Sequence, residues 1–184
     1  PDGQTLFFTS NMPEGFGGKD IWMIKKTQET KYKMLKKVNG EDSIDVKELV
    51  DAGWSKPINL GIDINTEGDE MFPSIRKDGI LYFSSNGLPG YGGLDVYSAK
   101  QVESKWILQR NEGLQLNSNA DDFGPTFLND SIGYFSSNRL GGKGKDDIYL
   151  FKFHKKYVTV GGTVLLTQNP KDVAKDHKIV LFDE

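Results

Sequence analysis

The sequence of 184 residues contains no cysteine, only two histidines and no long apolar run. The lack of cysteine excludes disulfides, thiol nucleophiles and cysteine-ligated metals, but it identifies no compartment, because many exported proteins also lack cysteine. No apolar run approaches the roughly 18 residues that a membrane-spanning helix requires. The formal net charge of −3 argues against a protein that tracks nucleic-acid phosphates, which normally carries a basic surface.

Glycine and aromatic residues are in excess. Glycine contributes 21 of the 184 residues, about 11%, against a usual share of roughly 7%. The chain also contains 11 Phe, 7 Tyr and 3 Trp, which is unlike a flexible linker. Together these residues predict many short strands joined by tight turns.

A repeat organises most of the chain, with copies at residues 2–25, 78–100 and 130–152. Each copy has an aromatic-Phe-Ser/Thr-Ser-Asn run, eight glycine-rich residues, and then Asp-Ile/Val followed by an aromatic residue. The positions that the copies share are Phe8, Asn11, Asp20, Trp22, Phe83, Asn86, Asp95, Tyr97, Phe135, Asn138, Asp147 and Tyr149. Such agreement indicates one structural unit used three times.

A second element precedes the later two copies. It begins at Trp54 and at Trp106, and in both cases a proline follows 19 residues later. Identical placement favours packing of these indoles between neighbouring units, and the alternative is that they stack on sugars. The first two copies are separated by 23 additional residues, within an insertion at about 27–53. We expect this insertion to form an extra hairpin or a short helix on a face used for contacts.

Each unit is predicted to consist of short antiparallel strands. Asp-Gly at 2–3 and 78–79 indicates a tight turn, because glycine adopts positive φ at little cost; the third copy has Asp-Ser at 130–131, which we expect to alter only the turn. The Leu-x-Phe alternation that follows fits a strand with one buried face. The segment that begins with tryptophan supplies an outer strand. About four strands per unit of 40–55 residues is typical of a propeller blade.

The pattern Asp-Gly, Leu-Tyr-Phe-Ser-Ser-Asn, Gly-x-Gly, Asp-Val-Tyr resembles the WD40-like (PD40, TolB-type) β-propeller repeat. With the segments at 54–61 and 69–73 ahead of it, the longer unit resembles the repeats of Bacteroidetes OmpA-family proteins. These include the outer-membrane lipoprotein associated with type IX secretion and gliding. The resemblance covers residues 1–153 and implies an all-β fold, a β-propeller fragment of about three blades from a ring of five to seven.

The tail, residues 154–184, resembles a linker and the first strands of a carboxypeptidase-regulatory-like β-sandwich. It has β-rich segments at 157–166 and 178–182 around a polar stretch. A sandwich normally needs about 70–100 residues, so we expect this one to be incomplete. The chain also begins without Met or a signal peptide, and we expect the natural N-terminus to be missing. A missing N-terminal strand would then close the ring against the last blade.

Two sets of acidic residues are candidate sites. The aspartates after the glycine-rich loops, Asp20, Asp95 and Asp147, would suit calcium, but one acid per unit favours hydrogen bonds from turn N–H groups. The paired acids at 69–70 and 121–122 would ring one mouth of a propeller and bind cations or basic ligands. The alternative for these pairs is that they cap turns or remain solvated.

The remaining polar candidates favour structural roles. The paired hydroxyl residues at 9–10, 84–85 and 136–137 lack a G-x-S-x-G elbow, and hydroxyls at strand ends usually bond to backbone groups. His154 and His177 lie outside the repeats, and their spacing supports neither a metal pair nor an acid–base pair. No phosphate-binding loop, dinucleotide fingerprint or zinc motif is present. We therefore assign no catalytic, cofactor-binding or metal-binding residue and expect no cofactor.

The resemblance implies a non-enzymatic envelope scaffold or protein-interaction module of an OmpA-family peptidoglycan-associated protein. It implies a location in the periplasm at the outer membrane, and a role in type IX secretion or gliding. The expected partners are other envelope proteins, and peptidoglycan through a domain outside this chain; nucleic acid is not expected. Two alternatives stay open: a propeller that binds a ligand or glycan at its mouth, and the gating propeller of a serine peptidase.

Overall fold

The computed structural model describes residues 3–27, 35–38, 41–43, 53–153, 165–166 and 169–173, and the chain divides into two compact units, 1–153 and 154–184. Every regular element in the described part is a β-strand, apart from one 3₁₀ turn at Gly113–Gln115. The prediction of an all-β chain is therefore confirmed. Within the same residues, no helix has the length and apolar character needed to span a membrane.

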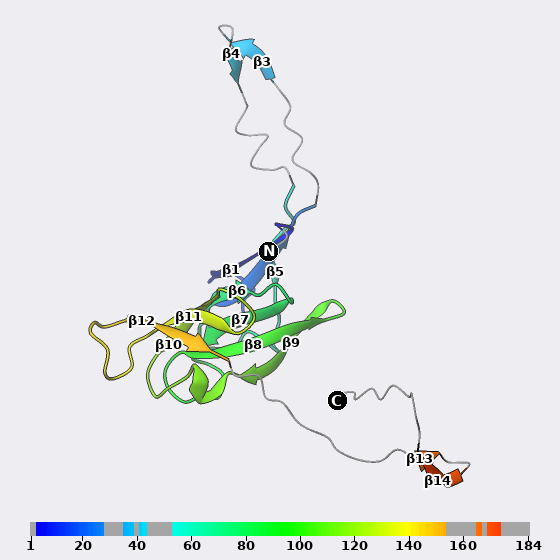
Figure 1. Ribbon diagram of the computed structural model, residues 1–184. Helices are drawn as coiled ribbons and strands as arrows, with labels where there is room; N and C mark the ends of the chain where they lie inside the picture. The colour runs from blue at the N-terminus through cyan, green and yellow to red at the C-terminus, as the bar shows by residue number, and fades with distance from the viewer. Residues whose placement is uncertain are drawn as a thin grey trace. The chain divides into compact units, whose positions relative to one another are not determined.

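The larger unit contains three antiparallel sheets (Figure 1). The first sheet consists of β1 (Thr5–Ser10), β2 (Asp20–Lys25) and β5 (Ile58–Asn59). The central sheet consists of β6 (Glu70–Ile75), β7 (Ile80–Ser85), β8 (Asp95–Val102) and β9 (Lys105–Asn111). The third sheet consists of β10 (Asp122–Phe127), β11 (Ile132–Ser137) and β12 (Asp147–Lys152). Strand order follows chain order in each sheet, so one sheet is completed before the next begins.

The three repeat copies form the same hairpin. The copies build β1–β2, β7–β8 and β11–β12, and the glycine-rich segment is the loop of each hairpin. The last serine of the first strand always faces the repeat aspartate: Ser10 faces Asp20, Ser85 faces Asp95 and Ser137 faces Asp147. The turn before the third hairpin differs as expected, because the Asn129 side chain accepts hydrogen bonds from the N–H groups of Ser131 and Ile132.

The first strands of the central and third sheets are irregular at the same place. The pairing of β6 with β7 shifts around Pro73, and the pairing of β10 with β11 shifts around Pro125. The preceding residue has a left-handed backbone in both strands, with φ of +56° at Phe72 and +64° at Gly124. Non-glycine residues rarely adopt this conformation. The Phe72 ring stacks on Phe123 of the next sheet, with centroids 5.0 Å apart, and so joins the two irregular strands.

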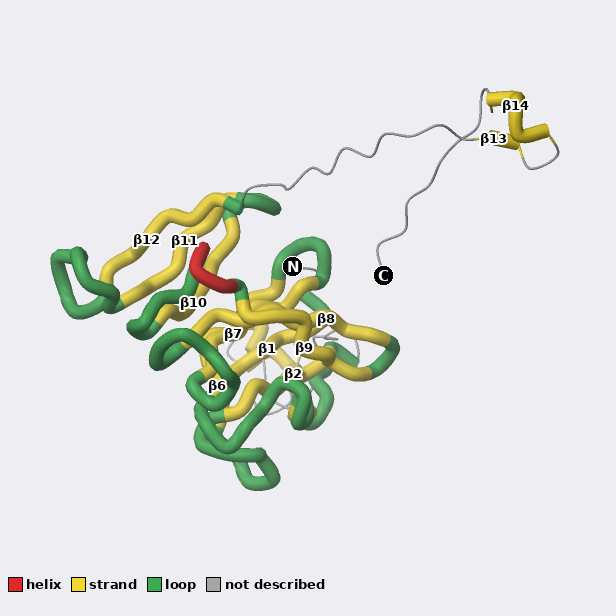
Figure 2. Tube along the Cα trace, turned by 90° about the horizontal axis from the view of Figure 1, so that it is seen from below, coloured by secondary structure: helices red, strands yellow, loops and turns green. Residues whose placement is uncertain are grey.

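In the central sheet, β7 and the first half of β8 are buried on both faces, because one core lies against the first sheet and a second core lies against the third. Figure 2 shows the third sheet beside the central one. Leu81 and Phe83 of β7 point towards the first sheet, and Tyr82 between them points towards the third. The first core contains Ile21, Met23, Leu60, Ile64, Leu81, Phe83, Tyr97, Ala99 and Trp106; the second contains Tyr82, Val96, Leu116, Phe135 and Phe151. Each large apolar side chain buried in this way contributes about 1.5–3 kcal/mol to stability.

Two short hairpins lie outside the three sheets. In the insertion, β3 (Leu35–Val38) pairs with β4 (Glu41–Ser43). The sequence suggested a hairpin or a short helix from residues 34–35 and 46–50; the second strand of the observed hairpin is 41–43, and 46–50 lies outside the described residues. In the tail, β13 (Leu165–Leu166) pairs with β14 (Asn169–Val173). The tail therefore contains a strand within the stretch that the sequence suggested to be a polar connection. The second expected strand, 178–182, lies outside the described residues.

Candidate functional site

The repeat aspartates hold the glycine-rich loops. The Oδ2 atom of Asp20 accepts hydrogen bonds from Phe16 N and from the Asn59 side chain, both at 2.7 Å. The Oδ2 atoms of Asp95 and Asp147 accept from two successive backbone N–H groups of their own loops, at 2.7–3.1 Å. No group of three or more His, Asp or Glu side chains in the described residues is placed to hold a metal ion. The geometry thus gives these aspartates a role in loop structure.

Two buried asparagines tie the linkers between sheets to the sheet that precedes them. Asn65 lies in the linker between β5 and β6. Its side-chain amide accepts a hydrogen bond from Ile21 N at 2.8 Å and donates one to Ile21 O at 3.0 Å, so the linker bonds to β2 as another strand would. Asn117 makes the same pair of bonds with Val96 of β8, at 2.7 and 2.9 Å. Each amide also donates to an asparagine at the end of the outer strand, Asn59 or Asn111.

Each acidic pair has one half-buried member, Asp69 or Asp121, and one fully buried member. Glu70 is fully buried, and its carboxylate accepts bonds from Thr66 N and Oγ1 and from Ser85 Oγ. Asp122, its counterpart in the next sheet, is also fully buried and accepts from Ser118 N and Oγ. These two acids are therefore enclosed between elements of the fold and do not line a mouth.

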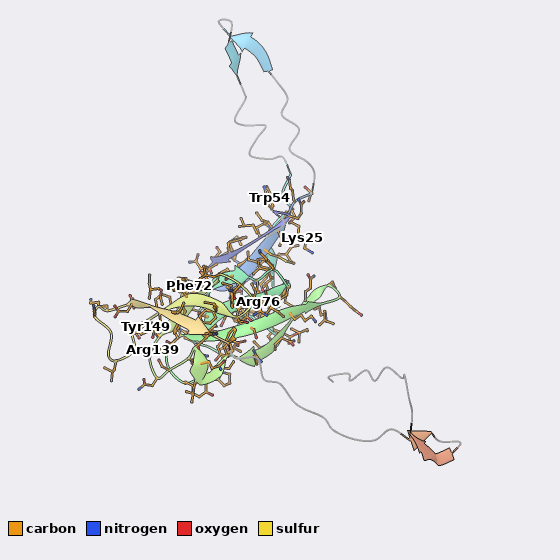
Figure 3. The ribbon with its side chains drawn as sticks, in the orientation of Figure 1. Lys25, Trp54, Phe72, Arg76, Arg139 and Tyr149 are labelled. Atoms are coloured by element: carbon orange, nitrogen blue, oxygen red, sulfur yellow. The ribbon has the colours of Figure 1, made fainter. Side chains whose placement is uncertain are left out.

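The third sheet adds an arginine that the central sheet lacks. Arg139 occupies the repeat position of Gly87, and its guanidinium contacts the Asp122 carboxylate at 2.5 Å. The same group lies over the rings of Phe135 and Tyr149, 4.8 and 5.1 Å from their centroids (Figure 3). A side chain at position 87 would displace Thr66, because a Cβ there would lie 1.8 Å from Thr66 Oγ1. The cation on a buried carboxylate is thus particular to the third sheet.

Several serines and asparagines of the repeat form hydrogen bonds with the paired acidic residues. Ser85 bonds to Glu70, whereas the adjacent Ser84 is buried with no partner among the described residues. The side-chain amide oxygens of Asn86 and Asn138 accept from the backbone N–H of Asp69 and Asp121, both at 2.7 Å. His154 and His177 lie outside the described residues.

The aromatic repeat positions differ in burial. Trp22 and Tyr97 are buried, and Tyr149 is half-buried. Trp106 is 5% exposed and meets Phe7 of the first sheet edge-on, with centroids 5.4 Å apart. Trp54, at the corresponding position, is 45% exposed and pairs with Lys26 only through an isolated backbone bridge. Identical spacing has therefore not produced identical packing.

A groove of about 390 Å³ opens between the first and central sheets. We name it the first groove. Apolar side chains from both sheets form its wall, and lysines from β2, from the turn between β6 and β7, and from β8 surround it. Lys25 and Arg76 are labelled in Figure 3. Its lining residues are Thr5, Phe7, Met23, Lys25, Ile75, Arg76, Lys77, Asp78, Gly79, Lys100, Gln101 and Trp106. The sequence singled out Asp78 and Gly79 only as a tight turn, and Trp106 is the one lining residue for which it suggested a ligand contact, as the alternative to packing between units.

Arg76 and Asp78 form an ion pair in the first groove, so their charges neutralise each other. Arg76 bonds to both carboxylate oxygens of Asp78, at 3.0 and 2.5 Å. This hydrogen bonding lowers the pKa of Asp78 and raises the pKa of Arg76. Arg76 also lies over the rings of Tyr82 and Phe127, and burial raises the pKa of Tyr82 to about 12. Arg76 is thus a structural cation between sheets.

The outer face of the third sheet exposes apolar side chains. Ile148 is 77% and Leu150 is 63% exposed. The residues at the same repeat positions in β8 are Val96 and Ser98, and both are buried against the third sheet. This face has the composition of an interface, and nothing in the described residues covers it.

Comparison with known proteins gives no match: no family model, no curated protein and no solved structure is similar to this chain.

Proposed function

We propose that this chain is a non-enzymatic interaction module built from β-propeller blades, which acts as a scaffold in the bacterial envelope. The observation that carries this proposal is the exposed face of the third sheet. Ile148 and Leu150 stand uncovered where the equivalent Val96 and Ser98 are covered by the following sheet. Each copy of the repeat places equivalent strand positions on the face that packs against the next sheet. A further copy of the same unit could therefore stack on this exposed face.

A ring is the arrangement that completes such a stack. The chain passes from sheet to sheet through the same backbone bond, from Glu70 N to Lys19 O and from Asp122 N to Leu94 O, both 2.6 Å. Equal linkages give equal steps between successive sheets. A linear stack leaves two faces open, whereas a closed ring of blades leaves none. We therefore propose that the three sheets belong to a ring of five to seven blades.

The envelope location and the partners are proposed from the sequence resemblance alone. The resembled OmpA-family proteins place a propeller beside a peptidoglycan-binding domain. In that setting the blades and the 27–53 insertion would contact other envelope proteins, including components of type IX secretion or gliding.

The ring is tested by electron cryo-microscopy of the natural full-length protein. We expect five to seven sheets around one axis, with the face of Ile148 and Leu150 covered by a further sheet. An open stack, or a covering element of another fold, would contradict the propeller.

The scaffold role is tested by cross-linking with an envelope extract. The bait is the purified chain, compared with a variant in which residues 27–53 are replaced by a short Gly-Ser linker; circular dichroism verifies that both are folded. We expect defined envelope proteins to cross-link to the first bait and to be lost with the second. If neither bait captures an envelope protein, the scaffold role is wrong.

A ligand-binding function is the second candidate. The specific observation in its favour is the first groove, which combines an apolar wall with exposed lysines.

A further inference from the structure

The first groove has a charge opposite to that of the whole chain. Its lining contains four cationic residues, Lys25, Arg76, Lys77 and Lys100, and one acid, Asp78. Four positive charges and one negative charge give +3, whereas the chain has a net charge of −3. A concave basic site on an acidic protein attracts anions to that place in preference to the rest of the surface.

The three lysines are available to a ligand. Arg76 and Asp78 neutralise each other. The ammonium groups of Lys25, Lys77 and Lys100 form no ion pair with any residue that the structure describes, and all three residues are exposed. A lysine ammonium is a compact charge with three donors on a flexible stem, so three of them can converge on one anionic group.

The wall of the groove offers an apolar contact. Phe7 and Trp106 meet edge-on, with centroids 5.4 Å apart, and Met23 and Ile75 lie beside them. Trp106 and Met23 are each only 5% exposed, so the half-buried Phe7 and Ile75 provide most of the accessible apolar surface. The volume of about 390 Å³ lies within the range of roughly 300–1,000 Å³ that is usual for small-molecule sites.

The basic character comes only in part from the repeat. Lys25 and Lys100 occupy the same repeat position, which is Lys152 in the third copy, whereas the position of Lys77 is Asn129 in the third copy. A smaller groove of about 260 Å³ lies between the central and third sheets, and Lys77 is the one lysine in its lining. The first groove is therefore distinguished by its combination of three lysines.

We propose that the first groove binds a small organic anion, a carboxylate or a phosphate ester with an apolar arm. The arm lies against Phe7 and Ile75, and the anionic head lies among Lys25, Lys77 and Lys100. This site is independent of the ring and of the envelope scaffold proposed above, and either proposal survives failure of the other.

The test is a ¹⁵N–¹H NMR titration of the 184-residue chain with three probes. The carboxylate probe is 3-phenylpropionate, the phosphate probe is phenyl phosphate, and the neutral control is 3-phenylpropan-1-ol. We expect saturable shifts of amides around the first groove with at least one anion, and at least tenfold weaker binding of the alcohol. The stronger of the two anions identifies the class of head group. Because the charges are exposed, binding should weaken when salt is raised from 20 to 200 mM.

The matched variants have equal charge. The triple variant Lys25→Gln, Lys77→Gln, Lys100→Gln should bind the preferred anion at least tenfold more weakly. The control Lys56→Gln, Lys143→Gln, Lys145→Gln removes three exposed lysines outside the groove and should change affinity less than twofold. Equal losses in both variants, shifts confined to the face of Ile148 and Leu150, or no binding of either anion at 10 mM would each overturn the proposal.

Discussion

At the scale of single residues, buried asparagines hold the linkers between the sheets in place. Asn65 and Asn117 each replace a strand partner, because one amide satisfies both the N–H and the C=O of a residue in the preceding sheet. A buried backbone group without a partner costs about 1–3 kcal/mol. The asparagine is therefore the residue type with the donor and acceptor that this place requires.

Replacing Asn117→Ala should destabilise the chain by about 1–3 kcal/mol, because the buried N–H of Val96 would lose its partner, while Val96 O would keep the bond from Glu112 N at 3.0 Å. Urea unfolding followed by tryptophan fluorescence measures the change. The matched control is Asn119→Ala, two residues further on at an exposed position, which should change stability by less than about 0.5 kcal/mol. Equal effects of the two substitutions would show that the amide bridge is unimportant.

The glycines of the loops give a second comparison. A Cβ on Gly92 would lie 2.3 Å from Ala120 O, whereas a Cβ on Gly144, its counterpart in the third copy, would meet nothing nearer than 3.6 Å. Gly92→Ala should therefore cost about 1–3 kcal/mol through overpacking, and Gly144→Ala should be close to neutral. Thermal unfolding of the two variants checks this; a destabilised Gly144→Ala would mean that the residue has another role.

Asp95 should make stability depend on pH in an unusual direction. Burial raises its pKa above the ordinary 3.8, against the opposing effect of the N–H groups of Gly92 and Tyr91. The folded state then binds the proton more tightly than the unfolded state, so this group's contribution to stability falls as pH rises through the interval above 3.8. Asp95→Asn removes the effect, and its stability relative to the parent chain should rise between pH 3 and pH 7. Urea unfolding at several pH values measures the difference; a constant difference would contradict the shift.

At the scale of strands and sheets, the repeat explains which faces are buried. Position 96 in β8 and position 148 in β12 are equivalent, yet Val96 is 0% exposed and Ile148 is 77% exposed. The difference arises because a further sheet covers β8 and no described element covers β12. Burial therefore depends on the neighbour as well as on the strand's own sequence.

Val96→Thr should destabilise the chain by about 1–3 kcal/mol, because it buries a hydroxyl without a partner. Ile148→Thr should change stability by less than about 0.5 kcal/mol and should reduce binding of an apolar dye to the exposed face. Chemical unfolding and dye fluorescence on the two variants give the comparison. A large loss of stability in Ile148→Thr would mean that this face is covered in solution.

The strands were predictable because their signals are local. The Leu-x-Phe alternation, the glycine-rich loop and the aspartate after it lie within about 20 residues, and β7–β8 follows them directly. The two tryptophans were not distinguishable in this way. Trp106 lies within β9, a strand of seven residues, whereas Trp54 precedes β5, a strand of only two residues. Aligning the repeat copies by sequence does not reveal this difference in strand length.

The first groove was not predictable for a different reason. Its lysines come from β2, the β6–β7 turn and β8, and in the sequence each is an unremarkable charge among 23 Lys and Arg residues. Only the packing of the first sheet on the central sheet brings them together. The pairing of Arg139 with Asp122 likewise needs the third sheet to be in place.

At the scale of the whole unit, the amide bridges have a consequence for how the chain unfolds. Backbone hydrogen bonds connect each sheet to the next, and an asparagine ties each linker to the sheet before it. Each sheet's stability therefore contains a contribution from the next. Such a chain behaves as a one-dimensional array with nearest-neighbour coupling. The central sheet has two neighbours, whereas the first and third have one each among the described residues. Amide hydrogen exchange should therefore be slowest in β7 and β8 and progressively faster towards β1 and β12, so that opening spreads inward from the two ends.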